Sequence, residues 1–215
     1  MNSIGTGELL LDKRKQSIAL TLVVVFVLLG VLIFFYFFSF VPIQGDSMEN
    51  TIHNKQYCFV QRKCNTIKRG DIVIINVSNS EENDEHDIVK RVIAVSGDKL
   101  IFMRSVENNV IETYICKKGD NKFKKLNEPY IKSAMSYAAA NFYATPVMQY
   151  MPELTTYDLN KLDHQTYAKI DQYIVYVPKN HIFFMGDNRN VSRDSRYYGT
   201  RSLEKVKYKV LTVVY

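Results

Sequence analysis

The sequence contains no tryptophan and only three cysteines, Cys58, Cys64 and Cys116. An odd number of cysteines without a C-x-x-C pair predicts neither a disulfide framework nor a zinc cage. We expect the three thiols to pack as ordinary residues, with a Cys58–Cys64 bridge across a turn as the alternative. The four histidines are dispersed, and none has a partner at the i, i+4 spacing of a helical metal site. We therefore expect no metal and no cofactor.

Acidic residues are in the minority, with 22 Asp and Glu against 28 Lys and Arg, which gives a formal net charge of +6. The basic residues are scattered through both halves of the chain, and no long cluster extends beyond "LDKRKQ" and "KKGDNKFKK". Nucleic-acid binding needs a concentrated basic patch or a known motif, so we do not expect nucleic acid as a partner. Scattered charge is enough to attract anionic membrane lipid, which we do expect as a partner.

Charged residues are absent from Gln16 to Gly45, and the middle of this stretch is almost wholly apolar. About 20 residues of helix cross the hydrocarbon of a bilayer, so the stretch is long enough to span one. Its exit, "FFSFVPIQG", has no Ala-x-Ala cleavage pattern, which favours a retained anchor over a cleaved signal peptide. We expect a transmembrane helix at residues 17–41.

The direction of this anchor is predicted by "LDKRKQ", which puts three basic residues directly before the apolar run. The positive-inside bias keeps such a short N-terminus in the cytoplasm. No second apolar run is long enough to span a membrane. We therefore expect residues 1–16 inside and residues 42–215 outside, as one extracytoplasmic domain on a single-pass anchor.

The outer domain is predicted to be mainly β. Short runs rich in Val, Ile, Tyr and Phe are separated by Gly, Asn and Asp, which is the pattern of strands and turns. These runs are "YCFVQRK", "DIVIINVS", "IVKRVIAV", "KLIFMRSV", "VIETYICKK", "YIVYVP", "HIFFMG" and "KYKVLTVVY". We interpret residues 107–175 as an insertion or cap between strands, since residues 132–169 are rich in Ala, Met and polar residues. The stretch "SEENDEHD" predicts a solvated acidic loop.

One serine, Ser47, follows the anchor closely, within "VPIQGDSMENTIHN". A free hydroxyl is too weak an acid to ionise at neutral pH, so a nucleophilic serine needs a base. The hydrolase elbow G-x-S-x-G is absent, but spacing does not exclude a Ser-His-Asp triad with His53 or His181. A lysine base is the other option, and Lys90 lies in the apolar run "HDIVKRVIAV".

Strand geometry puts Lys90 and its neighbour Arg91 on opposite faces, so we expect one to turn inward and the other to remain in water. Burial favours the neutral form of the amine. A free lysine has a pKa of about 10.4, and a base that operates near neutrality requires a fall of roughly 3 units, or about 4 kcal/mol, which desolvation can supply. An inward Lys90 is therefore a candidate base for Ser47.

Four segments occur together in the order typical of one family. They are "GDSMENTI", "RGDIVIINV", "KRVIAVSGD" and "GDNRNVSRDSRYYG", which match S-M-x-P-T-L, R-G-D-[IV]-V, K-R-V-x-G-x-P-G-D and G-D-N-R-x-x-S-x-D-S-R-x-x-G. On these motifs the sequence resembles the bacterial type I signal peptidases, membrane-anchored Ser-Lys endopeptidases that remove signal peptides from exported proteins. The resemblance implies a signal-peptidase-like domain at the outer face of a bacterial cytoplasmic membrane.

The resemblance also implies roles for five residues. Ser47 is the nucleophile and Lys90 is the general base. Ser192 would hydrogen-bond the lysine amine and help to orient it. Asp194 and Arg196 would form an ion pair that holds the last motif in shape.

The family cleaves after small residues, commonly in an Ala-x-Ala pattern, so the resemblance implies secreted preproteins as partners. We expect the substrate pocket to be lined by apolar residues adjacent to the reacting pair, namely Ile43, Met48, Ile52 and Ile88. The backbone N–H of Ser47 is expected to meet the oxyanion. Gly45, two residues earlier, has no hydroxyl, so the second oxyanion donor is unassigned.

Three positions depart from the family motifs. Asn50 stands where Pro is usual, and Ala94 and Ser96 stand where Gly and Pro are usual. Proline restricts φ and glycine permits conformations that alanine resists, so these changes alter the rigidity of loops near the site. The reacting groups are intact, and we interpret the departures as signs of a divergent paralogue with a narrower set of substrates.

Three other functions are weighed against this one. A non-cleaving assembly factor for surface proteins is supported only by the three departures. A penicillin-recognising Ser-x-x-K enzyme is matched by "SLEK" at residues 202–205, but its companion motifs are absent. A self-cleaving repressor of the Ser-Lys type is disfavoured because the N-terminus is a membrane span and not a helix-turn-helix.

Overall fold

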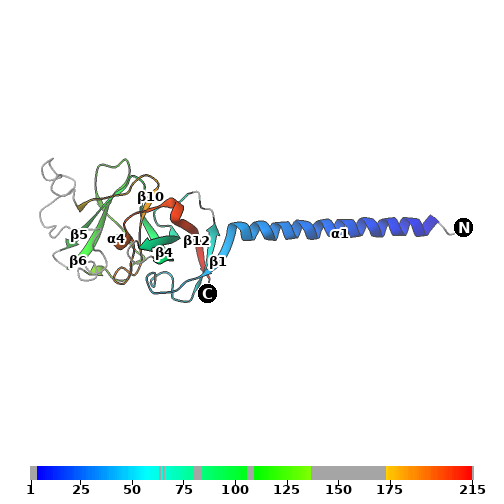
Figure 1. Ribbon diagram of the computed structural model, residues 1–215, viewed down its shortest axis with the longest axis horizontal. Coiled ribbons are helices and arrows are strands. Elements are labelled where there is room, and N and C mark those ends of the chain that lie inside the picture. The colour runs from blue at the N-terminus through cyan, green and yellow to red at the C-terminus, as the bar shows by residue number, and fades with distance from the viewer. Residues whose placement is uncertain are drawn as a thin grey trace. The chain divides into compact units, whose positions relative to one another are not determined.

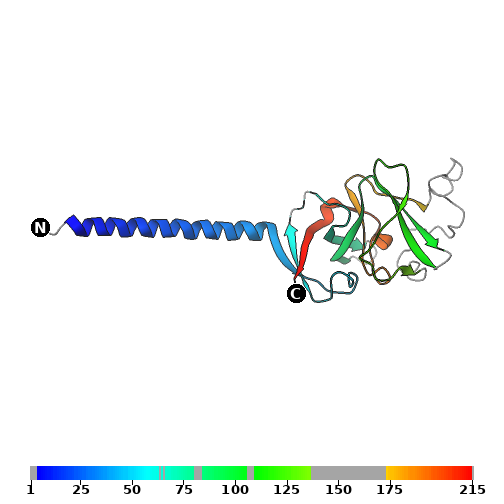
Figure 2. The same ribbon diagram turned by 180° about the vertical axis from the view of Figure 1, so that it is seen from behind.

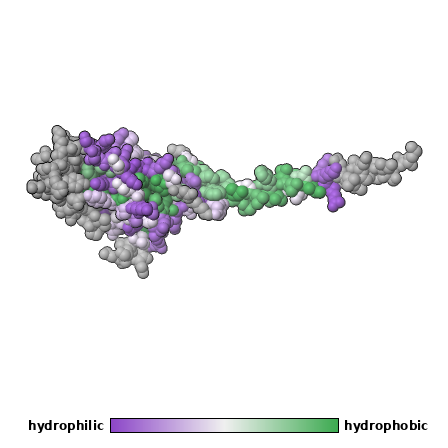
Figure 3. Space-filling model, turned by 90° about the horizontal axis from the view of Figure 1, so that it is seen from above, coloured by the Kyte–Doolittle hydropathy of each residue, from purple (hydrophilic) through white to green (hydrophobic). Residues whose placement is uncertain are grey.

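The computed structural model describes residues 4–62, 64, 66–79, 84–105, 109–136 and 173–214. The chain divides into two compact units, Met1–Ser39 and Phe40–Tyr215. The first unit contains α1 (Ile4–Phe37), whose segment Arg14–Phe37 is mostly apolar and is not buried. This segment is long and apolar enough to cross a membrane, and Figure 3 shows the apolar surface along it.

The helix ends at Phe37, four residues before the predicted end of the membrane span at residue 41. The chain continues as β1 (Phe38–Pro42), which pairs with β2 in the sheet. Proline disfavours the helical region for the residue before it, so the approach to Pro42 favours extended backbone. The β-branched and aromatic residues just before Pro42 therefore serve as an edge strand and not as the last turn of the helix.

The second unit is built on two antiparallel sheets, and the predicted mainly β fold is confirmed. The larger sheet has seven strands in the order β1-β2-β12-β3-β4-β10-β11. Its strands beyond β1 are β2 (Tyr57–Arg62), β3 (Ile72–Asn79), β4 (Asp84–Val95), β10 (His181–Met185), β11 (Arg201–Ser202) and β12 (Val206–Val214). Two short helical turns, α4 (Ser195–Tyr198) and η2 (Leu203–Lys205), lie next to β11 in the chain.

The smaller sheet has strands in the order β7-β6-β5-β9, with β8 paired to β6. The strands are β5 (Lys99–Ser105), β6 (Val110–Cys116), β7 (Lys124–Lys125), β8 (Met135–Ser136) and β9 (Val175–Tyr176). Figures 1 and 2 show β5 and β6 at one end of this unit and β12 at the other, with β4 and β10 between them.

Strands β3 and β4 form the longest described ladder in the second unit, a hairpin that pairs residues from Ile72↔Arg91 to Asn79↔Asp84. Successive residues of a strand point to opposite faces, and both faces of β3 are covered. Ile74 packs with Val89 in one core cluster, whereas Val73 belongs to a second cluster with Val92. A strand that is buried on both faces holds β4 firmly in register.

The two sheets share a core. Ile93 and Phe183 of the larger sheet pack with Leu100 and Phe102 of the smaller one, and the Phe102 and Phe183 ring centres are 5.8 Å apart. All four side chains are at most 2% exposed. Burying a side chain of this size contributes about 1.5 to 3 kcal/mol, so this cluster is a main support of the arrangement.

Each predicted β run contains a strand, but two sequence interpretations need correction. The second half of the predicted acidic loop "SEENDEHD" belongs to β4, which begins at Asp84, because it pairs with the end of β3. The described parts of the predicted insertion at 107–175 include β6, β7 and β8, which are strands of the smaller sheet. Residues 137–172 of this predicted insertion lie outside the described residues.

Candidate active site

Ser47 lies on the turn that leaves β1. Gly45 has a φ of +90°, a conformation that favours glycine, and its N–H donates to Asn54 Oδ1 at 3.2 Å. After Ser47 the chain makes one turn, in which the N–H of Ile52 donates to the Met48 carbonyl at 2.7 Å. Met48 and Ile52 are both almost fully buried. The buried Met48 and Ile52 side chains fix the turn, and they leave Ser47 close to the end of β1.

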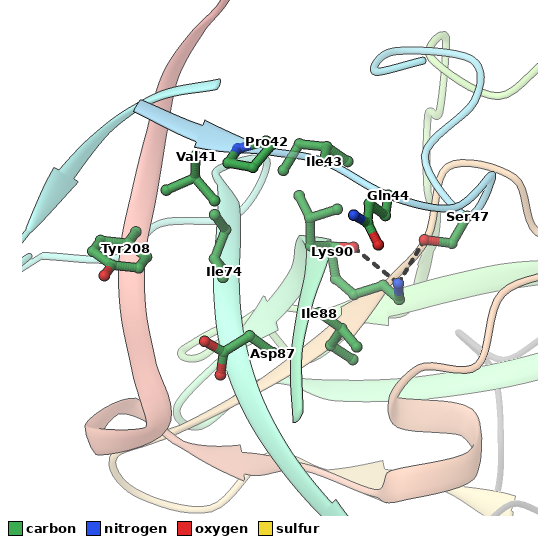
Figure 4. Close-up of a pocket in the computed structure, with 11 residues that line it drawn as sticks. Val41, Pro42, Ile43, Gln44, Ser47, Ile74, Asp87, Ile88, Lys90 and Tyr208 are labelled. Carbon is green, nitrogen blue, oxygen red and sulfur yellow. Dashed lines mark hydrogen bonds between the residues drawn. The ribbon is translucent and has the colours of Figure 1, made fainter. Parts of the chain in front are cut away.

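Lys90 projects from the middle of β4, where it is paired with Val73 of β3. The residue is only 3% exposed. Its Nζ donates to Ser47 Oγ at 2.7 Å and to the Val89 carbonyl at 2.9 Å. Figure 4 shows the two side chains pointing toward one another among the residues that line a pocket. The inward orientation predicted for Lys90 is therefore what the structure has.

The pKa of the Lys90 amine is shifted toward neutrality. Burial lowers its pKa from 10.5 to about 8, because the charged form loses its hydration. The carboxylates of Asp194 and Asp187 act in the opposite direction, and Arg196 acts with burial. A substantial fraction of Lys90 is therefore neutral slightly above neutral pH, and a neutral amine has the lone pair that a base needs.

Ser192 does not have the predicted hydrogen bond to Lys90. Its hydroxyl is buried and, among the residues that the structure describes, has no partner at ordinary hydrogen-bond geometry. The lysine amine is already engaged by Ser47 and Val89. The Ser192 hydroxyl lies instead against Gly186, and it is close enough to Asp194 to help lower the pKa of that carboxyl.

Asp194 and Arg196 form a fully buried ion pair. Arg196 Nε lies 2.8 Å from Asp194 Oδ1, and Arg196 Nη2 lies 2.8 Å from Asp194 Oδ2. The carboxylate also accepts from the Gly186 N–H at 3.0 Å. Although burial alone would raise it, the pKa of Asp194 is lowered by Arg196 and these hydrogen bonds. The pair ties the start of α4 to the turn after β10.

The turn after β10 holds the backbone of Ser47. The N–H of Asn188 donates to the Ser47 carbonyl at 3.0 Å, and the Asn188 amide donates to the Asp46 carbonyl at 3.1 Å. A β-carbon on Gly186 would overlap the Ser47 carbonyl oxygen and Ser192 Oγ. Glycine is therefore required at 186 by close approach, and the last motif acts as a cradle for the serine.

The expectation that Arg91, the strand neighbour of the inward Lys90, remains in water is wrong. Its side chain is 11% exposed and pairs with Asp187, with Nε to Oδ1 at 2.8 Å and Nη2 to Oδ2 at 2.6 Å. The Asp187 carboxylate also accepts from the Thr51 hydroxyl, and its backbone carbonyl accepts from the Asn50 amide at 3.1 Å. The opposite face of β4 is covered by these neighbouring loops, which the strand pattern does not reveal.

A pocket of about 280 Å³ opens beside Ser47 and Lys90. Two of the predicted walls, Ile43 and Ile88, line it, while Met48 and Ile52 do not. Both of these are core residues, packed with Cys58 and Val60. The other lining residues come from four segments of the chain, namely Val41, Pro42, Gln44, Ile74, Asp87, Val89 and Tyr208. Figure 4 labels all of them except Val89.

Proximity in sequence could have found Val41 and Gln44, but only the strand register reveals Ile74 and Tyr208. Ile74 lies opposite Val89 in the β3–β4 hairpin, and Tyr208 of β12 lies opposite Ile74 on the other side of β3. Asp87 brings a carboxylate to the pocket rim, and Lys207 bonds to it at 2.9 Å. The pocket is therefore apolar beside the serine and polar at one end.

The alternative partners for Ser47 lie elsewhere. His53 Nδ1 is 2.7 Å from Glu49, and His181 Nδ1 is 2.9 Å from the Lys179 carbonyl. Neither imidazole makes a hydrogen bond with the serine among the residues that the structure describes. Ser202 of "SLEK" accepts from the Glu204 N–H at 3.3 Å and so caps the η2 turn.

The three cysteines are free thiols, as the packing interpretation predicted. Burial raises the pKa of Cys58 to about 11, so this thiol is inert at neutral pH. Within the described ranges, no group of three His, Cys, Asp or Glu side chains could hold a metal ion.

The geometry defines what the site can do chemically. A serine hydroxyl lies within hydrogen-bond distance of an amine with a pKa near neutrality, and the amine is buried whereas the hydroxyl faces a pocket. This is the arrangement in which a base activates a nucleophile for attack on a bound carbonyl.

Comparisons with known proteins agree on one family. The family model described as "Signal peptidase, peptidase S26" matches residues 15–215. Signal peptidase I S of Bacillus subtilis strain 168 is 32% identical over 177 residues, which cover 81% of this chain and 74% of the relative. Signal peptidase I P of Bacillus subtilis subsp. natto is 31% identical over 194 residues, covering 86% and 82%.

A solved structure of a signal peptidase I from Enterococcus faecalis is 24% identical and covers 70% of this chain and all 100% of its own. The TM-score is 0.37, which is too low to carry an argument about the site. The family model and the Bacillus relatives are sufficient: the chain belongs to the signal peptidases of family S26, as a bacterial type I member.

Membership supports the removal of signal peptides as the activity and preproteins with signal peptides as the substrates. The N-terminal apolar helix fits a membrane-anchored bacterial protein.

Proposed function

We propose that this protein is a serine endopeptidase in which Ser47 is the nucleophile and Lys90 is the general base. The observation that carries the proposal is the 2.7 Å contact between Lys90 Nζ and Ser47 Oγ, made by a lysine that is 3% exposed. Ser192, Asp194 and Arg196 are the supporting residues. They act through the cradle around Gly186, and not through a direct bond to the amine.

The proposed reaction is an acyl transfer in two halves. Neutral Lys90 takes the proton of the Ser47 hydroxyl as Oγ attacks the scissile carbonyl, and the lysine ammonium then protonates the leaving amine. The acyl-enzyme is released by water, which Lys90 deprotonates as it attacks. The serine recovers its proton and the lysine ends neutral, so no cofactor or metal is needed.

The oxyanion would be met by the backbone N–H of Ser47. A donor of this kind is worth about 3 kcal/mol in the transition state. The Gly45 N–H is already bonded to Asn54, which leaves the second donor to be found by experiment.

The pocket supports a substrate with small side chains before the cut. Ile43 and Ile88 form apolar walls beside Ser47. A cavity of about 280 Å³ that must hold two side chains of the substrate leaves little room for large ones. We propose Ala-x-Ala-like cleavage sites of secreted preproteins as substrates. The segment would lie extended along the pocket, with backbone hydrogen bonds supplying much of the affinity.

We further propose a single-pass topology, with residues 1–16 in the cytoplasm, 17–41 as the anchor and 42–215 at the outer face of the cytoplasmic membrane. The basic residues before the apolar segment support this orientation. Residues 107–175 would belong to the peptidase domain, because β6, β7 and β8 are strands of its smaller sheet. Tethering next to the bilayer raises the effective concentration of the enzyme where exported chains emerge.

The proposal is tested by incubating the full-length protein in detergent with a preprotein whose signal peptide ends in Ala-x-Ala. The wild type should release the mature chain, while Ser47→Ala and Lys90→Ala should not. Equal processing by all three proteins would eliminate the dyad. No processing by the wild type on several preproteins would favour a non-cleaving assembly factor.

The topology has its own test. In spheroplasts of cells that express the protein with an N-terminal tag, added protease should digest the peptidase domain and leave the tag intact. A digested tag beside a protected domain would reverse the proposed orientation.

A further inference from the structure

A cluster of side chains outside the four motifs connects the neighbours of Ser47 to those of Lys90. Glu128 lies between β7 and β8 and pairs with Arg189 of the last motif. The pair is almost dry, with side-chain exposures of 9% for Glu128 and 1% for Arg189. Arg189 Nη1 donates to Glu128 Oε2 at 2.8 Å, and Nη2 donates to Oε1. A two-pronged contact of this kind fixes the plane of the guanidinium.

Arg189 also binds the Gly186 turn, which contacts the backbone of Ser47. Its Nε donates to the Gly186 carbonyl at 3.0 Å. Gly186 touches the Ser47 carbonyl so closely that a β-carbon would not fit. Any shift of Gly186 therefore moves the Ser47 backbone or loosens its contact with the turn.

Tyr130 connects Glu128 to Arg91, the strand neighbour of Lys90. Its hydroxyl donates to Glu128 Oε1 at 3.0 Å, and Arg91 Cζ lies 4.1 Å from the centre of its ring. Arg91 follows Lys90 in β4 and pairs with Asp187. Burial raises the pKa of the Tyr130 hydroxyl, so the hydroxyl stays protonated and continues to donate.

Stability alone is a weak reason for such a cluster. Apolar residues in place of a buried ion pair are often as stabilising, because desolvation offsets the Coulombic attraction. What apolar residues cannot supply is a fixed direction for each contact. Through Arg189, Glu128 restrains the Gly186 turn beside Ser47, and through Tyr130 it restrains Arg91 beside Lys90. The separation of these two segments determines the 2.7 Å contact between Lys90 and Ser47.

We propose that Glu128 is a positioning residue for the Ser47–Lys90 pair, acting through Arg189 on Gly186 and through Tyr130 on Arg91. This inference rests on the function proposed above. It gives Glu128 and Tyr130, which belong to none of the four motifs, a part in the reaction.

The test compares Glu128→Gln with Glu112→Gln in the full-length protein. Glu112 is a matched control, because it accepts from the Tyr114 hydroxyl at 2.9 Å and from Lys125 Nζ at 2.7 Å but belongs to the smaller sheet. Misplacing reacting groups by a fraction of an ångström to 1 Å costs about 10- to 100-fold. We expect that loss in kcat for Glu128→Gln, with KM within about twofold, and no comparable loss for Glu112→Gln.

Further variants separate positioning from stability. Glu128→Asp keeps the charge and should recover part of the kcat, and Glu128→Gln with Arg189→Gln should lose no more than the worse single variant. All proteins are assayed well below their melting temperatures. If Glu128→Gln does not accumulate, Tyr130→Phe replaces it. That variant removes only the hydroxyl bond and should lower kcat severalfold without changing KM.

Two results would overturn the inference: a kcat for Glu128→Gln equal to that of Glu112→Gln, or a loss confined to KM. Ser47→Ala is included as a reference. If Ser47→Ala is inactive and Glu128→Gln is fully active, only the positioning role fails. If Ser47→Ala cleaves, the proposed function fails with it.

Discussion

The two sides of the Ser47–Lys90 contact are built differently. On the pocket side, Ile43 and Ile88 meet open space, and the surface is shaped mainly by aliphatic side chains. On the opposite side, the last motif supplies polar residues that are at most 2% exposed, namely Asp187, Arg189, Ser192, Asp194, Ser195 and Arg196. Aliphatic contacts are non-directional and tolerate exchange, whereas buried charges require each partner in place. Substitutions on the pocket side should therefore change which substrate side chains are accepted. Substitutions on the buried side should lower the stability of the folded protein.

The largest effect is expected from Lys90→Met, which removes the group between the two sides. General-base catalysis contributes about 10²- to 10⁴-fold, and preprotein cleavage should fall by at least that factor. Single-turnover cleavage measures the loss. Activity within tenfold of the wild type would show that another group deprotonates Ser47.

The same variant should be more stable than the wild type near neutral pH. Below about pH 8, Lys90 is protonated in both folded and unfolded chains, and the folded state bears the whole cost of burying the charge. Between about 8 and 10.5 the unfolded chain binds more protons, so wild-type stability rises with pH. Lys90→Met should gain up to about 3 kcal/mol at pH 7, with the gain shrinking toward pH 10.5. A difference in unfolding free energy between Lys90→Met and the wild type that does not change with pH would contradict the lowered pKa of Lys90.

The next largest effect is expected from breaking the buried Asp194–Arg196 ion pair. Asp194→Asn leaves Arg196 charged and without its carboxylate, which should cost about 3 to 5 kcal/mol of unfolding free energy. Glu85→Gln is the control, because Glu85 and Lys205 are exposed and 3.4 Å apart, and it should cost less than about 1 kcal/mol. Urea unfolding compares them. Similar costs for both would remove the distinction between buried and exposed pairs.

The pH profile of the wild type tests the dyad without mutation. Only neutral Lys90 is competent, so cleavage should rise about tenfold per pH unit until it levels off above about 8. The rate at pH 6 should be about 100-fold below the plateau. A rate that is flat between pH 6 and 7 would argue against a lysine base.

A smaller effect is expected on the pocket side. Ile88→Ala enlarges the wall and should improve cleavage after Val relative to Ala by about tenfold, since each methylene is worth about 1 to 3 kcal/mol in such pockets. Ile52→Val is the control, because Ile52 is buried outside the pocket, and it should lower stability by about 1 kcal/mol without changing the preference. An unchanged Val-to-Ala ratio for Ile88→Ala would remove Ile88 from the selectivity wall.

The smallest effect is expected at Asn50, which joins the serine turn to the buried side. Asn50→Ala removes the 3.1 Å bond to the Asp187 carbonyl and should cost about 1 kcal/mol. Asn50→Pro loses the same bond but restrains the chain, so it should lie closer to the wild type. If Asn50→Ala melts above Asn50→Pro, proline does not suit the backbone of this turn, and the expected restraint is contradicted.

Much of the fold was predictable because its signals are local. Alternating and β-branched runs identified the long strands, and the four motifs identified the family. The two-residue strands β7, β8 and β11 were missed, since so short a segment has no period to detect. The apolar run before Pro42 was assigned to the helix because hydropathy does not distinguish a membrane helix from an apolar strand.

The site was predictable to the extent that its residues lie in motifs. Ser47, Lys90, Asp194 and Arg196 were all proposed from sequence, and the structure brings Ser47 to Lys90 and Asp194 to Arg196. Glu128 carries no such signal, because its partner Arg189 is 61 positions away. Long-range partners depend on the packing of two sheets.

The sequence by itself determined the reactive groups, their order along the chain and the apolar segment that precedes them, because composition and local periodicity carry that information. The tertiary structure decided three further properties. It set the 2.7 Å contact across 43 positions, the burial that lowers the pKa of Lys90 to about 8, and the choice of Ile43 and Ile88 over Met48 and Ile52 as pocket walls. Each depends on which side chains exclude water from one another, and that is settled only when the strands pack.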